Sequence, residues 1–171
     1  KGNDVTLLNG KLEVAEEAAD KFYILVQNYA DLTVSGMTLD GTNLDKWSKT
    51  DGDSYTLSNN SGEVIVKDSR IIANNDGDKA FAFDVCKQES YTEPTVTVTN
   101  TTVEGNIEAA AKVGNVYYAT FETAKAEIGD KAKSDEDVLS YIAFPAQAEK
   151  FFDYREEMKD KIYTYEFKTV E

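Results

Sequence analysis

Apolar and polar residues alternate along several short segments of the first hundred residues. The clearest segments are 31–35, 63–67 and 95–99, in which Leu, Val or Ile residues recur at every second position. Alternation with a period of two, in segments rich in Val, Ile and Thr, is typical of half-buried β-strands. Gly, Asn and Asp residues between the segments indicate turns. The pattern therefore predicts a mainly β structure built from short strands.

The alternating pattern recurs at a constant spacing along the chain. Two motifs recur in this way, and their copies are 31–35, 63–67 and 95–99 for the first and 38–42, 70–74 and 102–106 for the second. The copies are 32 positions apart. A repeat of this length cannot close a core by itself, so neighbouring repeats are expected to stack as coils of a solenoid. Equivalent residues of adjacent coils then lie about 4.8 Å apart. Evenly spaced hairpins of a β-sandwich are the alternative interpretation.

Stacked coils predict rows of equivalent residues. One inward row is expected to contain Leu32, Val64 and Val96. A second row places Val5-Thr6-Leu7 in register with Met37-Thr38-Leu39, and its members are Leu7, Leu39, Ile71 and Val103. Upstream, Tyr23 aligns with Tyr55, so Asn28 and Asn60 are expected to meet at a turn and form a side-chain ladder. Segment 81–85 is interpreted as a third copy of this strand, followed by a short insertion around 91–94.

The recurring strand and turn, followed by Thr38-Leu39-Asp40-Gly41-Thr42-Asn43, resemble the coils of a right-handed parallel β-helix. Such coils occur in pectate-lyase-like enzymes and in many bacterial surface or adhesin-like proteins. The resemblance covers residues 1–111, and the repeat implies coils of about 32 residues.

The pattern changes in the C-terminal third of the chain. A short helix is predicted around 118–124, with Thr120 as its N-cap. A second helix is predicted over 145–159 and a half-buried strand over 162–170. Solenoids need their ends covered, so residues 112–171 are interpreted as an α+β cap. The alternative is that they begin a second module.

The composition excludes several classes of partner. The chain carries 32 Asp and Glu residues against 18 Lys and Arg residues, a formal net charge of −14. An acidic surface repels phosphate groups, so no nucleic-acid partner is expected. No apolar stretch reaches the roughly 20 residues of a membrane-spanning helix, so no membrane insertion is expected. Few Cys and many Asn, Thr, Asp and Tyr favour an extracellular or cell-surface bacterial protein, although no signal peptide is visible.

Two residue types limit the chemistry of the chain. His is absent, which excludes a Ser-His-Asp or Cys-His nucleophile and any His-ligated metal site. The single Cys86 excludes an internal disulfide and a CxxC motif. Catalysis would therefore depend on acids or on a bound metal.

Acidic residues at repeating positions are the candidates for catalysis. Asp31 and Glu63 are expected one coil apart, and Asp40 and Glu104 two coils apart, which is about 10 Å. The first separation is near the roughly 5 Å of retaining glycosidases and the second is just beyond the roughly 6.5–9.5 Å of inverting ones. A polysaccharide-active enzyme fragment, either lyase or glycoside hydrolase, is therefore the alternative function. Its residues would be Asp31, Asp40, Glu63, Asp68, Glu104 and Arg70. The simpler interpretation is a solvated face, with Arg70 in a structural ion pair beside Asp68.

A calcium site is a further alternative, although no cofactor is required by the leading interpretation. Asn74, Asp76 and Asp78 form an oxygen-rich turn. When this turn is aligned as an EF-hand loop, Ile72 and Phe83 occupy the first and twelfth positions, where acids are needed. Only an irregular calcium site remains as an alternative to a polar turn.

Aromatic residues in turns and insertions are the candidates for ligand binding. Trp47, Tyr29 and Tyr91 lie outside the predicted strands, where exposed rings can stack on sugars. The sequence therefore favours a non-catalytic, adhesin-like module with a binding or structural role, whose partner is a glycan or a host or cell-surface protein. A repeat unit that only propagates a fibre or stalk is a further hypothesis.

Overall fold

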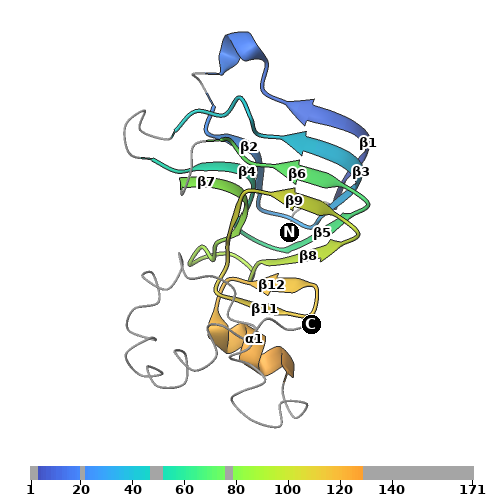
Figure 1. Cartoon of the computed structure of the whole chain (residues 1–171). Helices are drawn as coiled ribbons and strands as arrows, with labels where there is room; N and C mark the ends of the chain where they lie inside the picture. The colour runs from blue at the N-terminus through green and yellow to red at the C-terminus, as the bar shows by residue number, and fades with distance from the viewer. Residues whose placement is uncertain (1–3, 20–21, 47–51, 76–78, 129–171) are drawn as a thin grey trace.

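The computed structural model describes residues 4–19, 22–46, 52–75 and 79–128 (Figure 1). This part of the chain is mainly β, as the sequence predicts. In chain order the elements are β1 (Val5–Glu13), the 3₁₀ helix η1 (Glu16–Ala18), β2 (Ile24–Asn28), β3 (Leu32–Asp40), β4 (Ser54–Asn59), β5 (Glu63–Lys67), β6 (Arg70–Ile72), β7 (Ala80–Val85), β8 (Thr95–Thr99), β9 (Thr102–Glu104), β10 (Asn106–Glu108), β11 (Ala111–Val113), β12 (Val116–Tyr118) and α1 (Phe121–Ile128).

The strands form two open sheets. The first sheet has the order β11-β12-β8-β5-β3-β6-β9, with β1 also paired to β3, and the second has the order β10-β7-β4-β2. Every pair is parallel except β11–β12 and β12–β8. From β2 to β5 the chain alternates between the sheets (Figure 1).

Strands of the first sheet pair in the register that the repeat predicts. Leu32 lies beside Val64, and Val64 lies beside Val96. Their exposed fractions are 4%, 0% and 0%, so this inward row is confirmed. In the second half of β3 the same register places Leu39 beside Ile71, which lies beside Val103.

The predicted position of Leu7 in that second row is wrong. β1 pairs with β3 in a different register, so Leu7 lies beside Val34, and Leu12 is the residue that lies beside Leu39. The triplet Val5-Thr6-Leu7 has the same apolar–Thr–apolar pattern as two different parts of β3. Periodicity alone cannot distinguish these two registers, so the pairing of β1 with β3 is known only from the structure.

The second sheet corrects the predicted asparagine ladder by one position. β2 pairs with β4 so that Asn28 lies beside Asn59 rather than Asn60. Consecutive side chains of a strand point to opposite faces, so this difference decides which asparagine faces Asn28. Segment 81–85 is a copy of the same strand, as predicted, with Phe83 beside Leu57.

Connection lengths explain how the register of the first sheet is retained. The connection from β6 to β7 spans 73–79 and is shorter than the one from β3 to β4, which spans 41–53. The connection from β7 to β8 spans 86–94 and is longer, by the same amount, than 60–62, which joins β4 to β5. Because the shortening and the lengthening are equal, β8 pairs with β5 at the same sequence spacing at which β5 pairs with β3.

Residues with a left-handed backbone conformation form a column at the bend of the first sheet, within β1 and β3, between β5 and β6, and between β8 and β9. Its members are Asn9, Gly36, Asp68 and Asn100, with φ values of 50°, 64°, 50° and 45°. Gly, Asn and Asp adopt this conformation at the least cost. Asn100 also donates a hydrogen bond from Nδ2 to Oδ1 of Asp68 at 2.6 Å. The column therefore places the bend at the same position in successive units.

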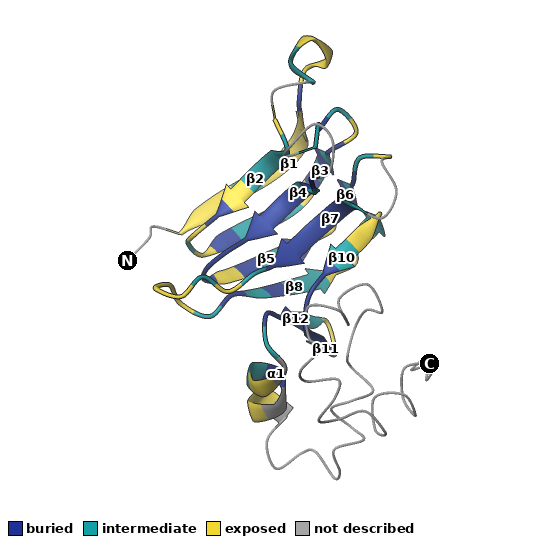
Figure 2. Ribbon diagram, turned by 90° about the vertical axis from the view of Figure 1, so that its left-hand side faces the viewer, coloured by how far each residue is buried: buried dark blue, intermediate teal, exposed yellow. Residues whose placement is uncertain are grey.

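The core lies between the two sheets. Val34 and Leu39 from the first sheet and Leu57 and Phe83 from the second belong to one cluster of buried residues, and each is 0% exposed. Burial of a side chain of this size stabilises a fold by about 1.5–3 kcal/mol. In Figure 2, β4 and β7 are buried along most of their length, whereas β1 is exposed along most of its length.

An antiparallel hairpin and a helix follow the parallel strands. The hairpin, β11–β12, pairs with β8, and Ala124 of α1 packs against Ala111 and Tyr118. The predicted N-cap is confirmed, because Thr120 Oγ1 accepts a hydrogen bond from the backbone N–H of Thr123 at 3.2 Å. The predicted domain boundary after residue 111 falls inside β11, and the predicted helix 145–159 and strand 162–170 lie outside the described residues.

Candidate functional site

Two of the three aromatic candidates lie side by side on the surface. Tyr29 follows β2 and Tyr91 lies in the connection between β7 and β8, yet their ring centroids are 5.1 Å apart and the rings are tilted by 51°. The two residues are 43% and 53% exposed. We call them the tyrosine pair. The third candidate, Trp47, lies outside the described residues.

Buried asparagines hold the turn that carries Tyr29. Asn28 donates hydrogen bonds from Nδ2 to Oδ1 of Asn59 at 2.8 Å and to the carbonyl of Ser61 at 3.1 Å. Asn59 in turn donates from Nδ2 to the carbonyl of Gly62 at 3.0 Å and to that of Thr95 at 2.9 Å. These bonds join three successive turns, so the backbone at Tyr29 is fixed to its neighbours.

An ion pair and two hydroxyl groups hold the connection that carries Tyr91. Lys87 Nζ lies 2.5 Å from Oε2 of Glu93. Oε1 of Glu93 accepts hydrogen bonds from the hydroxyls of Thr120 and Thr123, at 3.2 Å and 2.9 Å. The two ends of the connection are thereby linked to each other and to the start of α1.

The pKa of Glu93 reflects these contacts. Partial burial favours the neutral carboxyl, but the hydrogen bonds from Lys87 and Thr123 and the positive charge of Lys87 have the larger combined effect. The pKa of Glu93 therefore lies below its ordinary value of 4.5, and the carboxylate is charged at neutral pH.

Side-chain amides near the tyrosine pair were not singled out from the sequence. Gln27 donates from Nε2 to the hydroxyl of Tyr29 at 3.2 Å. Gln88, whose carbonyl accepts the backbone N–H of Tyr91 at 3.0 Å, donates from Nε2 to Oδ1 of Asn60 at 3.2 Å. The position of Gln27 two places before Tyr29 was the available signal, because alternate residues of a strand lie on the same face. No periodic signal indicated Gln88, which lies in the insertion.

The tyrosine pair and the amides form a surface with a defined chemistry. Aromatic faces pack against the C–H groups of sugar rings, and amides both donate and accept hydrogen bonds with hydroxyl groups. Neither group is charged. The surface is therefore suited to an uncharged, hydroxyl-rich ligand.

The calcium candidates are only partly described. Asn74 donates from Nδ2 to the carbonyl of Leu44, which makes its amide nitrogen part of a structural contact. Asp76 and Asp78 lie outside the described residues. Among the residues that the structure does describe, no group of three or more Asp, Glu or Cys side chains is placed to hold a metal ion.

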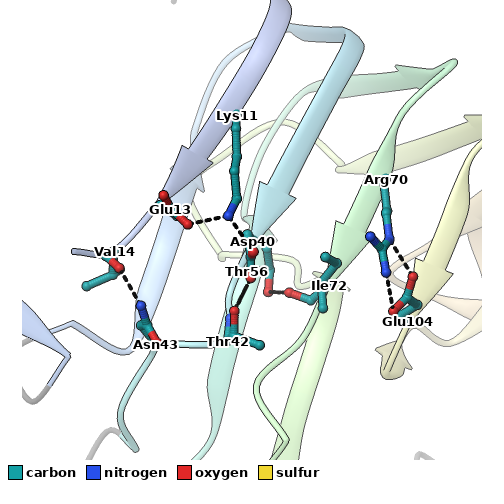
Figure 3. Close-up of polar contacts among 10 residues, drawn as sticks. All are labelled: Lys11, Glu13, Val14, Asp40, Thr42, Asn43, Thr56, Arg70, Ile72 and Glu104. Atoms are coloured by element: carbon teal, nitrogen blue, oxygen red, sulfur yellow. Dashed lines mark hydrogen bonds and ion pairs between the residues drawn. The ribbon is translucent and has the colours of Figure 1, made fainter. Parts of the chain in front are cut away.

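The acidic candidates Asp40 and Glu104 lie on the outer face of the first sheet (Figure 3). Ile72 lies between them in the same column, which confirms that they are two strands apart. Each is paired with a cation. Lys11 Nζ lies 3.0 Å from Oδ2 of Asp40, and Arg70 donates to both carboxylate oxygens of Glu104 at 2.5 Å and 2.9 Å.

The carboxyl groups respond to these partners. Desolvation acts to raise the pKa of Asp40, but hydrogen bonds from Thr42 and Lys11 outweigh it and lower the pKa. The bonds from Arg70 lower the pKa of Glu104. Both groups are therefore charged at neutral pH, whereas a general acid needs a raised pKa.

The other acids have separate structural contacts. Asp31 accepts a hydrogen bond from the backbone N–H of Glu63 at 2.9 Å, so it caps the neighbouring strand. Asp68 occupies the left-handed bend and accepts the bond from Asn100. Arg70 forms a structural ion pair, as predicted, and its partner is Glu104, because parallel pairing places the two side chains on adjacent strands.

Comparisons of the chain with protein-family models, with curated proteins and with solved structures found no match. Within the described ranges, no helix is long and apolar enough to cross a membrane.

Proposed function

We propose that the chain is a non-catalytic, adhesin-like binding module of an extracellular or cell-surface protein, and that the tyrosine pair binds glycans. The carrying observation is that Tyr29 and Tyr91, which lie far apart in the sequence, present adjacent exposed rings. Two adjacent exposed tyrosine rings offer apolar faces on which a sugar ring can stack, together with hydroxyl groups that can form hydrogen bonds. The amides of Gln27 and Gln88 support recognition of hydroxyl groups.

The proposed architecture is a right-handed parallel β-helix with coils of the length of the sequence repeat. Parallel pairing of equivalent strands in both sheets, such as Leu32 beside Val64 and Leu57 beside Phe83, supports it. The alternation of the chain between the sheets and the column of left-handed bends also agree with stacked coils. A crystal structure tests this proposal. A chain that passes through both sheets in every coil, around one core, would support it, whereas a two-sheet sandwich without such coils would contradict it.

A glycan array tests the proposed function. The purified chain is screened with and without calcium, and each ligand found is titrated by calorimetry. We expect Tyr29→Ala and Tyr91→Ala to weaken binding by about tenfold each, since loss of one stacked ring removes about 1–3 kcal/mol. Phe22→Ala is the matched control, because Phe22 is 51% exposed and lies outside the pair. Binding that survives both tyrosine substitutions contradicts the proposal.

The enzymatic alternative has a separate test. The candidate acids of the described region are distributed over the outer face of the first sheet, a strand cap and a bend, and those with resolved pKa shifts are lowered. We therefore expect no cleavage when the chain is incubated with polysaccharides and the reducing ends are counted. Cleavage that is lost in Asp40→Asn or Glu104→Gln would instead support the enzyme.

A further inference from the structure

The outer edge of β1 is free within the described part of the chain. β1 is a long strand, and its described pairing is with β3 on one side only. A free strand edge presents unpaired backbone N–H and C=O groups, which are the groups that bind another strand. The edge is therefore competent for strand addition.

The apolar interior is open at the same edge. Val5 and Leu12 are 46% and 37% exposed, whereas the residues paired with them, Leu32 and Leu39, are 4% and 0% exposed. The inward rows thus continue into β1 without a layer to cover them in the described part of the chain. An added strand with apolar residues at alternate positions would bury these side chains as β1 buries Leu32 and Leu39.

Charges on the outer face define the added strand more closely. In both ionic contacts of Figure 3 that join two strands, a cation of one strand reaches an acid of its neighbour: Lys11 of β1 reaches Asp40 of β3, and Arg70 of β6 reaches Glu104 of β9. Glu13 lies beside Asp40 in the same column, its carboxylate contacts Lys11 of its own strand, and its side chain is 50% exposed.

Other acids surround this end of the fold. Asp4, Glu16 and Glu17 are also exposed, so the described groups near the edge are Asp4, Lys11, Glu13, Glu16 and Glu17, with acids in excess. An acid that a neighbouring strand placed next to Glu13 would repel the Glu13 carboxylate, whereas a Lys or Arg placed there would attract it.

We infer that β1 is a docking edge for a partner polypeptide that adds one parallel strand, with apolar residues over Val5, Leu7 and Leu12 and a basic residue beside Glu13. The excess of acids at this end disfavours a second copy of the chain as the occupant, because two copies would bring like charges together.

Synthetic peptides test this inference, since β3 already has the required pattern and bend. The probe is a labelled peptide of residues 31–41 with Asp40→Lys, whose parallel register on β1 places the lysine beside Glu13. The matched control is the unmodified peptide, which places Asp there. A third peptide carries Asp40→Lys and Val34→Pro, which removes a backbone donor and breaks the strand. Binding is measured by fluorescence anisotropy.

We expect the lysine peptide to bind roughly fivefold more tightly than the unmodified peptide, as one exposed ion pair allows. With the Glu13→Gln chain, checked for folding by circular dichroism, the difference should fall below about twofold. The proline peptide should not bind. Absence of binding at about 1 mM lysine peptide, an equal affinity of the first two peptides, or binding of the proline peptide overturns the inference. A stable dimer in sedimentation equilibrium also overturns it, because the second copy would then be the occupant.

Discussion

Asn28 donates a hydrogen bond to Asn59 across two neighbouring parallel strands, 2.8 Å from Nδ2 to Oδ1, at a place where both side chains are buried. Asn59 is 0% exposed and also donates to two backbone carbonyls. The pair satisfies carbonyl groups in the turns that follow the strands. These hydrogen bonds therefore stabilise the turns and also hold the backbone that positions Tyr29 of the tyrosine pair.

We predict that Asn59→Ala lowers the free energy of unfolding by about 2–4 kcal/mol, because it removes the side-chain hydrogen bonds that join Asn59 to Asn28, Gly62 and Thr95. Urea denaturation followed by circular dichroism measures the change. Exposed Asn75 is the matched control, and Asn75→Ala should cost less than about 0.5 kcal/mol. Equal effects at the two positions would contradict a structural role for the buried pair.

Three glycines with positive φ should tolerate alanine to different extents. At Gly114, with φ of 58°, an added Cβ meets nothing within 4 Å, so only backbone strain of about 1–2 kcal/mol is expected. At Gly36 the Cβ would lie 2.3 Å from Oδ1 of Asn9, a side chain that can move. At Gly62 it would lie 2.6 Å from the backbone oxygen of Ala30, which cannot move freely.

Destabilisation should therefore increase from Gly114→Ala to Gly36→Ala to Gly62→Ala, and the last should lower the free energy of unfolding by more than about 3 kcal/mol. Thermal and urea unfolding of the three variants measure it. Adding Asn9→Gly to Gly36→Ala should recover part of the loss, and failure to recover any would show that the clash with Asn9 is not its cause.

Glu93 should contribute to the loss of folding stability at low pH. Its pKa is lower in the folded chain than its ordinary value of 4.5, so its stabilising contribution is present above that pH and is lost as the pH falls through the folded pKa. Because the contacts are partly exposed, the contribution should not exceed about 1 kcal/mol. Unfolding measured from neutral pH down through the folded pKa should show a shallower decline for Glu93→Gln. An unchanged slope would contradict the lowered pKa.

The hydroxyl and the ring of Tyr29 should contribute separately to ligand binding. Tyr29→Phe keeps the stacking face and removes only the group that accepts the hydrogen bond from Gln27, so a loss of less than about threefold is expected. Tyr29→Ala removes the face and should cost about tenfold. Calorimetry with a glycan identified by the array measures both. Equal losses would indicate that the hydroxyl, rather than the ring, makes the main contact.

The register of β3, β5 and β8 was predictable because alternation and spacing are local properties of the sequence. Leu32, Val64 and Val96 retain both. The register of β1 was not predictable, because Val5-Thr6-Leu7 matches two parts of β3 equally well. Asn59 and Asn60 are adjacent and identical, so only the pairing of the strands shows which one meets Asn28.

The candidate site was predictable only residue by residue. Tyr29 and Tyr91 each have the features of an exposed aromatic residue in a turn, but Tyr91 lies in an insertion that has no counterpart in the other repeats. Its distance from Tyr29 depends on how that insertion folds back, which involves Gln88, Lys87 and Glu93. Such contacts leave no periodic signal.

The compensation between the connections 73–79 and 86–94 has a consequence for engineering. β8 keeps its spacing to β5 because a shorter connection before β7 is followed by a longer one after it, so a change in one connection is compatible with the fold when the next one compensates. The short turn 60–62 occupies the place that the longer connection 86–94 occupies one strand further along. Replacing the turn 60–62 would remove Asn60 and Gly62, which hold Gln88 and Asn59, so the tyrosine surface depends on the short turn as much as on the longer connection.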